Sequence, residues 1–269
     1  MTGRDQKPSL TLSIRLKIWP LSKYAPKLLV KPTRRKPICM LQKTRGVALS
    51  YIRYRETSII ARVYTEEYGL QSYIVNGVRS ARSKTNKIAL YQPLTLLEMV
   101  VYHKEDRDLH RISEVKTNYP FQSLPFEVAK SSMAMFITEM LTKTLKEETG
   151  NPALFTFLMD SVLFLEAART NYENFHLSFL LKLTAFLGFG PENAREFENQ
   201  LRENSYPFLP DDDMDRGLNI LIRYPYGTPA ILTRAQRNEL LDALVAYFHI
   251  HIDSLGEVKS LPVLREVLG

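Results

Sequence analysis

The hydrophobic period changes once along this chain, near residue 119, and that change limits the folds that the chain can adopt. Before this point apolar and polar residues alternate, as in half-buried strands. After it, apolar residues recur every three to four positions, as in amphipathic helices. Pro120 and Pro125 lie at the junction and disfavour continuation of either element. The sequence therefore predicts an α+β protein, with an all-β domain over residues 40–118 and an all-α helical domain over residues 119–269.

The first domain contains five short runs that are rich in β-branched and aromatic residues, which is typical of strands. Turn signals such as Asn76-Gly77 separate them. The predicted strands are Thr44–Leu49, Ser58–Tyr64, Leu70–Val75, Leu94–Tyr102 and Leu109–Thr117. So small a sheet protects its edges best by closing on itself, which favours a five-stranded OB-fold barrel, a common platform for oligonucleotides.

The second domain contains helical stripes of apolar residues, which predict a bundle of helices. The predicted helices span residues 126–145, 153–168, 175–187 and 234–253, with a short one at 263–267. Prolines and glycines punctuate residues 201–230, and we expect this stretch to be irregular.

The charge of the chain is distributed unevenly. The net charge is +7 overall, but residues 40–118 carry +5 and residues 119–269 carry −7. A basic barrel indicates an acidic partner such as nucleic acid, while an acidic helical half indicates a different kind of partner. The chain has no run of 18 apolar residues, so no membrane-spanning helix is expected. The single cysteine, Cys39, excludes a disulfide framework and a cysteine-based zinc site, and fits a reducing, intracellular compartment.

Residues 1–39 form a basic leader with five prolines and a net charge of +9. Three interpretations fit this composition. It resembles a targeting peptide, because it is rich in Arg and Lys and nearly free of acids. It also resembles a nucleic-acid-binding tail, because residues 31–36 hold four basic side chains. The third interpretation, a misassigned start with the true start at Met40, is favoured because the strand pattern begins only four residues later. In each case we expect the leader to be unstructured.

A basic segment between the third and fourth predicted strands is the candidate DNA-binding site. Its cations alternate with Ser, Thr and Asn, and phosphate oxygens are bound by such mixtures of charged and small polar donors. Two arginines in the turn after the first strand and a lysine in the last turn of the barrel join them. The predicted DNA-binding residues are Arg79, Arg82, Lys84, Lys87, Arg53, Arg55 and Lys104. Four tyrosines are available to stack on bases, namely Tyr51, Tyr54, Tyr73 and Tyr91. The alternative, a solvated loop with core tyrosines, stays open.

Three groups of residues in the helical half have side chains of the types that serve as metal ligands or nucleophiles in enzymes. Asp211, Asp212, Asp213 and Asp215 have the oxygens for a magnesium nuclease, but they lie in an expected loop without a nearby Lys or His base. His249 and His251 are two positions apart and point to different helix faces. Ser131-Ser132 lies near a helix start, outside any GxSxG elbow. The chain also lacks GxxxxGK[ST] and GxGxxG motifs, so we predict no catalytic residue and no metal ligand.

Five blocks in order carry a resemblance to a known family. The first block consists of TRGVAL, YRETSII and TEEYGL between residues 44 and 70. The other four are NGVRSARSK at 76–84, QPLTLLE at 92–98, YF with His251 at 247–251, and KSLPVL at 259–264. Together they resemble the bacterial DNA repair protein RecO family over residues 40–269. Two departures stand out. The four-cysteine zinc site of many members is absent, so no cofactor is expected, and the paired basic residues of the family's "GARR" segment are replaced by Arg79-Ser80.

The resemblance implies an OB domain, a helical domain and a non-enzymatic recombination mediator. Such proteins bind single- and double-stranded DNA, anneal complementary strands, and act with RecR, often with RecF, to load RecA onto strands covered by single-strand DNA-binding protein (SSB). We expect the same partners here, including the C-terminal tail of SSB, in the bacterial cytoplasm at the nucleoid, and no membrane partner. The alternatives are a generic OB-fold single-strand binder or, less favoured, a Mg-dependent nuclease.

Overall fold

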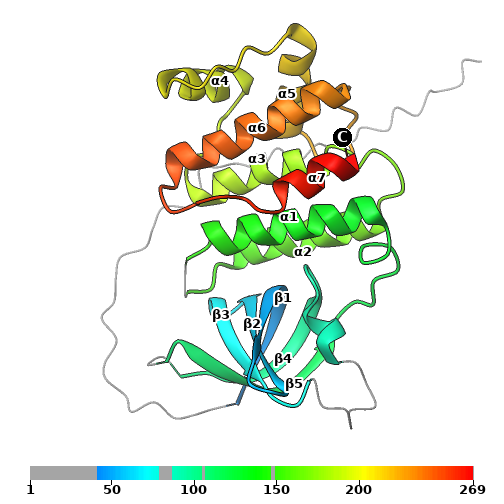
Figure 1. Cartoon of the computed structure of the whole chain (residues 1–269), viewed down its shortest axis with the longest axis vertical. Coiled ribbons are helices and arrows are strands. Elements are labelled where there is room, and N and C mark those ends of the chain that lie inside the picture. The colour runs from blue at the N-terminus through cyan, green and yellow to red at the C-terminus, as the bar shows by residue number, and fades with distance from the viewer. Residues whose placement is uncertain (1–40, 79–86, 105–106, 147–148, 269) are drawn as a thin grey trace, which may run out of the picture. The chain divides into compact units, whose positions relative to one another are not determined.

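The computed structural model describes residues 41–78, 87–104, 107–146 and 149–268 (Figure 1). Five strands and a short 3-10 helix form the first domain. They are β1 (Leu41–Tyr54), β2 (Ser58–Thr65), β3 (Gly69–Val75), η2 (Lys87–Tyr91), β4 (Leu96–Tyr102) and β5 (Leu109–Thr117). The strands close into a barrel in the order β1-β2-β3-β5-β4, in which only the β3–β5 pair is parallel. The predicted OB-fold barrel is thereby confirmed.

The first strand is longer than the sequence predicts. β1 pairs with β4 through its first half and with β2 through its second half, and a bulge between Ala48 and Ser50 shifts the register where the two halves meet. A bulge bends a strand and increases its twist, which lets one strand serve both sides of a small barrel. Arg53, expected in the following turn, therefore lies on β1, where it pairs with Ile59.

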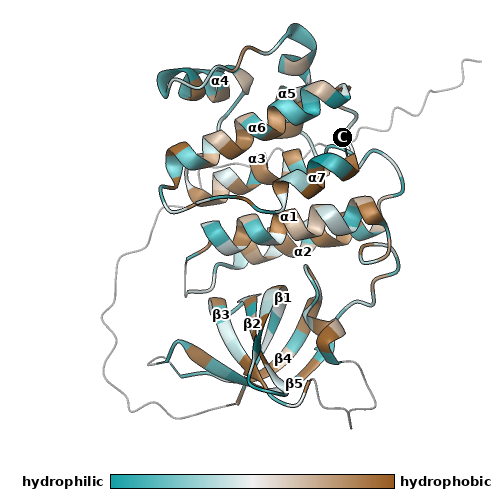
Figure 2. Ribbon diagram, in the orientation of Figure 1, coloured by the Kyte–Doolittle hydropathy of each residue, from teal (hydrophilic) through white to brown (hydrophobic). Residues whose placement is uncertain are grey.

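Seven helices follow the barrel within the described residues. They are α1 (Val128–Thr144), α2 (Pro152–Ala167), α3 (Phe175–Leu187), α4 (Ala194–Glu203), α5 (Asp212–Arg223), α6 (Arg234–His251) and α7 (Leu261–Leu268). Helices α2 and α3 carry hydrophobic residues on most of their surface, whereas α4 and α5 carry a narrow hydrophobic stripe (Figure 2). None of these described helices is long and apolar enough to cross a bilayer.

The expectation that residues 201–230 are irregular was wrong, because α4 ends in this stretch and α5 lies within it. Met214, Leu218 and Leu221 form a buried stripe on α5 at helical spacing. Gly217 obscures that stripe in the sequence, but it has a packing role. A Cβ at this position would lie 2.7 Å from the Leu232 side chain, so the segment before α6 packs against the bare backbone.

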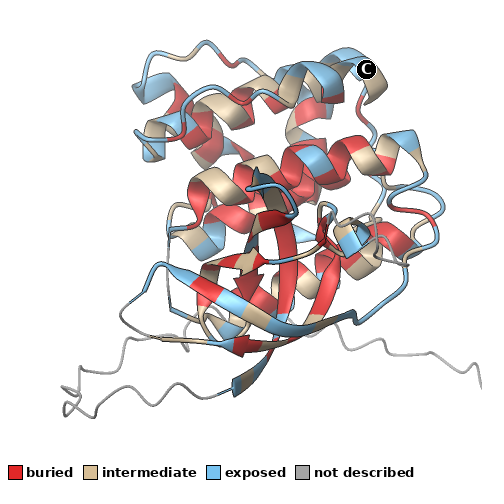
Figure 3. Cartoon of the chain, turned by 60° about the horizontal axis from the view of Figure 1, so that its bottom comes forward, coloured by how far each residue is buried: buried red, intermediate tan, exposed pale blue. Residues whose placement is uncertain are grey.

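The barrel and the helices share one of the two hydrophobic cores. Val47, Tyr64 and Leu96, on the outside of the barrel, are 0% exposed and belong to the same cluster as Met133 and Phe136 of α1. A separate cluster fills the barrel interior. Figure 3 shows burial along α1 and the neighbouring strands. Part of the barrel surface is therefore covered by helices, and only the remainder is available to a ligand.

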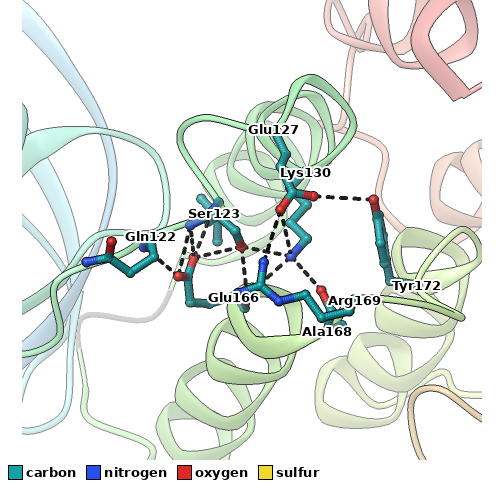
Figure 4. A network of polar contacts seen from close by, with 9 residues as sticks. Gln122, Ser123, Glu127, Lys130, Glu166, Ala168, Arg169 and Tyr172 are labelled. Carbon is teal, nitrogen blue, oxygen red and sulfur yellow. Dashed lines mark hydrogen bonds and ion pairs between the residues drawn. The ribbon is translucent and has the colours of Figure 1, made fainter.

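The chain between β5 and α1 is held by a buried carboxylate (Figure 4). The Glu166 side chain, at the end of α2, accepts hydrogen bonds from the backbone N–H groups of Gln122, Ser123 and Leu124 at 2.5, 3.0 and 2.7 Å. Burial alone would raise the pKa of Glu166, but these donors outweigh it and lower the pKa below its ordinary value. The segment that joins the two domains is thereby fixed on α2.

Lys130 completes this arrangement from α1, and its side chain is fully buried. Its ammonium donates to Ser123 Oγ at 2.8 Å, Glu166 O at 3.2 Å and Ala168 O at 2.6 Å, and lies 5.1 Å from the centre of the Tyr172 ring. Every ammonium hydrogen can thus find an acceptor, which makes the burial of this charge tolerable. We call Lys130, Glu166 and the backbone of residues 122–124 the linker cluster.

Candidate nucleic-acid interface

The outward side chains of β1, β2, β3 and β5 form two adjacent rows on the uncovered side of the barrel, because paired residues of neighbouring strands point the same way. The first row is Ser50, Arg62, Ser72 and Leu109, and the second is Ile52, Ile60, Ile74 and Arg111. The side chains of Arg62 and Arg111 are exposed, and Ile52 is 63% exposed. We call these eight residues the basic face.

The chemistry of the basic face suits a nucleic-acid strand. In the first row Arg62 is paired with Ser50 on one side and Ser72 on the other, so the row holds the mixture of charged and hydroxyl donors that phosphate oxygens accept. In the second row the isoleucines offer an apolar shelf beside Arg111. Sugars and bases can lie on such a surface while the phosphates face the cations.

The predicted site residues fall into three groups. Arg79, Arg82 and Lys84 lie outside the described residues, so their role stays a prediction. Arg53 and Arg55 are exposed at the β1–β2 turn, and because Arg53 pairs with Ile59, which points into the barrel, Arg53 lies at the rim of the barrel and not in the rows of the basic face. Arg55 has a φ of 53°, a left-handed conformation, and its guanidinium lies 5.1 Å from the centre of the Tyr54 ring.

Lys87 and Lys104 make up the third group. Lys87 is exposed at the start of η2, which packs against β1. Lys104 lies in the loop between β4 and β5, and its backbone N–H reaches His110 Nδ1 at 3.5 Å. The structure thus brings Arg53 and Arg55 together, and places Lys104 beside the first residues of β5.

Stacked rings support the loop that carries Lys104. The rings of Tyr68 and His103 are stacked with centroids 3.8 Å apart, and those of His103 and His110 with centroids 4.4 Å apart. His110 is buried, and burial together with the neighbouring His103 lowers its pKa. A neutral His110 can accept the Lys104 N–H, so the base of this loop is held in place.

The cations of the basic face and of the turns around it have no carboxylate partner in the part of the chain that the structure describes. Among the described residues, no Asp or Glu oxygen lies within 4.0 Å of the charged groups of Arg53, Arg55, Arg62, Lys104 or Arg111. Charges that are exposed and unpaired contribute little to folding, and they are free to bind a polyanion.

The other side of the barrel differs. A groove of about 480 Å³ on β1, β4 and β5 is lined by Glu66, Glu67, Glu98 and Glu114. Two of its three cations are paired with these carboxylates: Lys116 contacts Glu98 at 2.7 Å, and Arg45 donates to Glu66 at 2.8 and 2.6 Å, while Lys43 is the third. The paired guanidinium lowers the pKa of Glu66. Carboxylates would repel phosphate here, so a strand is directed to the basic face.

The prediction that four tyrosines are available for stacking was wrong for two of them. Tyr73 and Tyr91 are 0% exposed, because Tyr73 points into the barrel from β3 and Tyr91 packs on its core from η2. Tyr51 and Tyr54 are half-buried and remain available.

Arg62 and Arg111 were not among the residues predicted from the sequence, although a signal for Arg62 was present. In SIIARVY, Ile59, Ala61 and Val63 alternate into the barrel, so the arginine between them must point outward. Arg111 gave no such signal, because its place on the basic face depends on the parallel pairing of β3 with β5.

The acidic run at Asp211 is a helix start and not the loop that was expected. Asp211 caps α5 by accepting the Met214 N–H at 2.8 Å, and Asp212, Asp213 and Asp215 occupy the first turn, where the helix dipole favours negative charge. A search of the described residues finds no cluster of three or more His, Cys, Asp or Glu side chains that could hold a metal ion.

The hydroxyls of Ser131 and Ser132 also have local partners. Each donates to a backbone carbonyl three residues earlier on α1, at 3.1 and 2.9 Å, as helical serines commonly do.

Comparison with known proteins covers both domains. The sequence model described as recombination protein O N terminal matches residues 40–121, and the one described as recombination protein O C terminal matches residues 126–262. The DNA repair protein RecO of Phocaeicola vulgatus is 37% identical over 243 residues, which are 86% of this chain and 100% of the relative. Those of Flavobacterium psychrophilum and Christiangramia forsetii are 35% and 34% identical, and the matches span 84% and 86% of this chain and 99% and 100% of the relatives. The chain therefore belongs to the RecO family of DNA repair proteins.

Proposed function

We propose that this protein binds DNA on the basic face of its barrel and anneals complementary strands without ATP or metal. The observation that carries the proposal is the pair of exposed arginines, Arg62 and Arg111, which have no carboxylate partner among the described residues and share one face of the barrel with Ser50 and Ser72. The membership of a DNA repair family and the names of the relatives support it.

Annealing follows from charge neutralisation. Two strands repel each other through their phosphates, and cations that bind one strand lower the repulsion that the second must overcome. Because the cations are already exposed, no chemical step is needed. We further propose the loop residues Arg79, Arg82 and Lys84 as additional contacts. The mediator role, in which the protein helps to load RecA onto SSB-covered strands, extends this proposal to its protein partners.

Those partners are RecR, RecF and the C-terminal tail of SSB, and we assign them to the helical half. Its net charge of −7 over residues 119–269 makes it unsuited to DNA as a whole and leaves its surface for proteins. The acidic tail would still need a local basic and apolar groove. A labelled tail peptide that fails to bind the full chain would contradict this part of the proposal.

Strand annealing of fluorescent complementary oligonucleotides in EDTA tests the proposal. The wild type is expected to pair the strands without metal or ATP. The double variant Arg62→Met, Arg111→Met is expected to slow pairing, and to make the log–log salt slope of single-strand affinity shallower by about 1.4, since each lost phosphate contact removes about 0.7. The control, Arg195→Met, removes an exposed cation from α4 that forms no ion pair with a described carboxylate.

Each other outcome points elsewhere. Binding without annealing would leave a generic single-strand binder, and identical slopes for the double variant and the control would remove the basic face from the site. Cleavage that requires magnesium and disappears in Asp213→Ala would replace the proposal with a nuclease.

A further inference from the structure

A cleft of about 680 Å³ lies where the barrel meets α1 and the start of α7. The barrel contributes Ser50 and Tyr51 of β1 and Arg62 of β2, while the helical half contributes residues such as Met135 of α1 and Val263 of α7. Volumes of roughly 300–1,000 Å³ hold one drug-sized ligand, so this cleft admits one or two nucleotides of a single strand but no duplex.

The charge balance of the cleft is positive. Its one carboxylate, Glu139, is committed to the start of α7, because it accepts the backbone N–H groups of Lys259 and Ser260 at 2.9 and 2.7 Å. Lys143 lies 3.8 Å from the same carboxylate and donates to Leu255 O at 3.0 Å. These contacts outweigh burial and lower the pKa of Glu139. Arg62 and Lys259 then remain as exposed cations that no described carboxylate pairs.

Apolar surface accompanies these cations. Met135 is 49% exposed and Val263 is 45% exposed, on helices that face the barrel across the cleft. The half-buried Tyr51 ring and Pro93 lie on the barrel side. Flat bases can stack on an aromatic ring and pack against such side chains whatever their sequence.

The cleft continues the basic face without a break. Ser50 and Arg62 belong to both, since they form the first row of the face and also line the cleft. The short helix η2 also reaches the cleft, because it begins at Lys87 and its last residue, Tyr91, lines the cleft. A strand bound on the face is therefore carried toward the cleft.

We propose that single-stranded DNA passes from the basic face into this cleft, where Lys259 and Arg62 bind its phosphates and Tyr51, Met135 and Val263 contact its bases. The inference rests on the proposed function and extends it, because it makes the helical half part of the DNA site. An acidic peptide is the competing occupant. DNA is favoured because Arg62 and Ser50 are shared with a face whose second row has exposed side chains at both ends, Ile52 on β1 and Arg111 on β5.

Anisotropy titrations of the full chain with oligothymidylates of about 6 and about 20 nucleotides test the path, since one OB barrel covers about 4–16 nucleotides. Lys259→Glu is expected to weaken the long oligonucleotide about tenfold, to make its salt slope shallower by about 0.7, and to leave the short one unchanged. Lys259 contacts Glu139 through its backbone N–H and not through its side chain, so the substitution keeps that contact. Arg195→Glu on α4, with the same change of charge, is the matched control.

A second measurement does not depend on affinity. With Cys39 replaced by serine, Val263→Cys introduces a single thiol at the cleft. The long oligonucleotide is expected to slow alkylation of that thiol, and the short one to leave it unchanged. Equal effects of Lys259→Glu and Arg195→Glu at both lengths, with an unprotected thiol, would overturn the inference.

The two proposals fail in different ways. If Arg62→Met, Arg111→Met leaves all DNA binding intact, the proposed function itself fails. If that double variant weakens both oligonucleotides while Lys259→Glu weakens only an acidic peptide that ends in an apolar residue, the cleft belongs to a protein partner and the inference falls alone.

Discussion

Lys130 and Arg62 are both single cations within apolar stretches of the sequence, but their side chains have opposite surroundings in the structure. Lys130 is fully buried, and its ammonium is saturated by three oxygen acceptors within 3.2 Å. Arg62 is exposed on the barrel, and no described carboxylate pairs with it. A positive charge therefore stabilises the fold in the linker cluster, whereas on the basic face it is available to bind a ligand.

The difference teaches how to separate structural charges from functional ones in this molecule. A buried cation that loses its acceptors is very unfavourable, so its partners hold the fold together. An exposed cation without partners adds almost nothing to stability, and its free energy of interaction remains available for a ligand. The two classes predict opposite responses to one substitution.

The largest effect is expected from Lys130→Met, which keeps the length of the side chain but removes the ammonium. Three acceptors lose their donor inside the protein, so the free energy of unfolding should fall by about 3–5 kcal/mol. Urea denaturation measures this. The matched control is Arg62→Met, whose cost should stay within about 0.5 kcal/mol.

For DNA affinity we expect the opposite order of effects for these two variants. Arg62→Met should weaken binding, while Lys130→Met, at temperatures where it is folded, should bind as the wild type does. Equal stability losses in the two variants would break the comparison.

His176 tests the same rule with a buried group for which the described residues provide no countercharge. Its side chain is 2% exposed, its ring lies 6.5 Å from that of Phe136, and burial, with Arg237 nearby, lowers its pKa to about 3. Below about pH 6.5 His176 is protonated in the unfolded chain but stays neutral in the folded chain. Stability should thus fall by about 2 kcal/mol between about pH 8 and about pH 5.

The measurement is urea denaturation of the wild type and His176→Leu across that range. The difference between them isolates this histidine, because most carboxylates titrate at lower pH. Parallel curves would show that another group causes the loss.

The sequence was enough for the barrel but not for the surfaces on it. Alternation in SIIARVY and LQSYIV placed β2 and β3 correctly, since a half-buried strand must alternate. The length of β1 was underestimated, because its bulge at Ala48 and Ser50 interrupts the parity on which such reasoning depends. Pairing across a closed barrel is non-local, so the meeting of Arg62 and Arg111 on one face could not be read from spacing.

The helical half shows the same limit. α5 was missed because Gly217 and an aspartate run look like a loop, whereas the run caps the helix and the glycine admits Leu232. The burial of Lys130 could not be predicted, since two of its three acceptors, Glu166 O and Ala168 O, come from residues 36 and 38 positions later.

The predicted basic loop gives a smaller effect, on DNA binding alone. Replacing its four cations with alanine should make the single-strand salt slope shallower by up to about 2.8, since each lost phosphate contact removes about 0.7. Filter binding over a range of salt concentrations measures the slope. The four residues are Arg79, Arg82, Lys84 and Lys87. An unchanged slope would leave the basic face to account for binding without the loop. We expect no change in stability in either case, since Lys87, the member of the four that the structure describes, is exposed.

The smallest effect is expected from Arg45, which is partnered like Lys130 but exposed like Arg62. It forms two hydrogen bonds with Glu66, and its side chain is 47% exposed, so water already solvates the charge. Arg45→Met should lower the free energy of unfolding by less than about 1 kcal/mol. It should leave the DNA salt slope unchanged, because the neighbouring carboxylates repel phosphate. A double-mutant cycle with Glu66→Gln separates the pair from the packing of Arg45 on Phe155, 5.3 Å away. A loss as large as that of Lys130→Met would show that partners alone, and not burial, decide which charges hold this fold together.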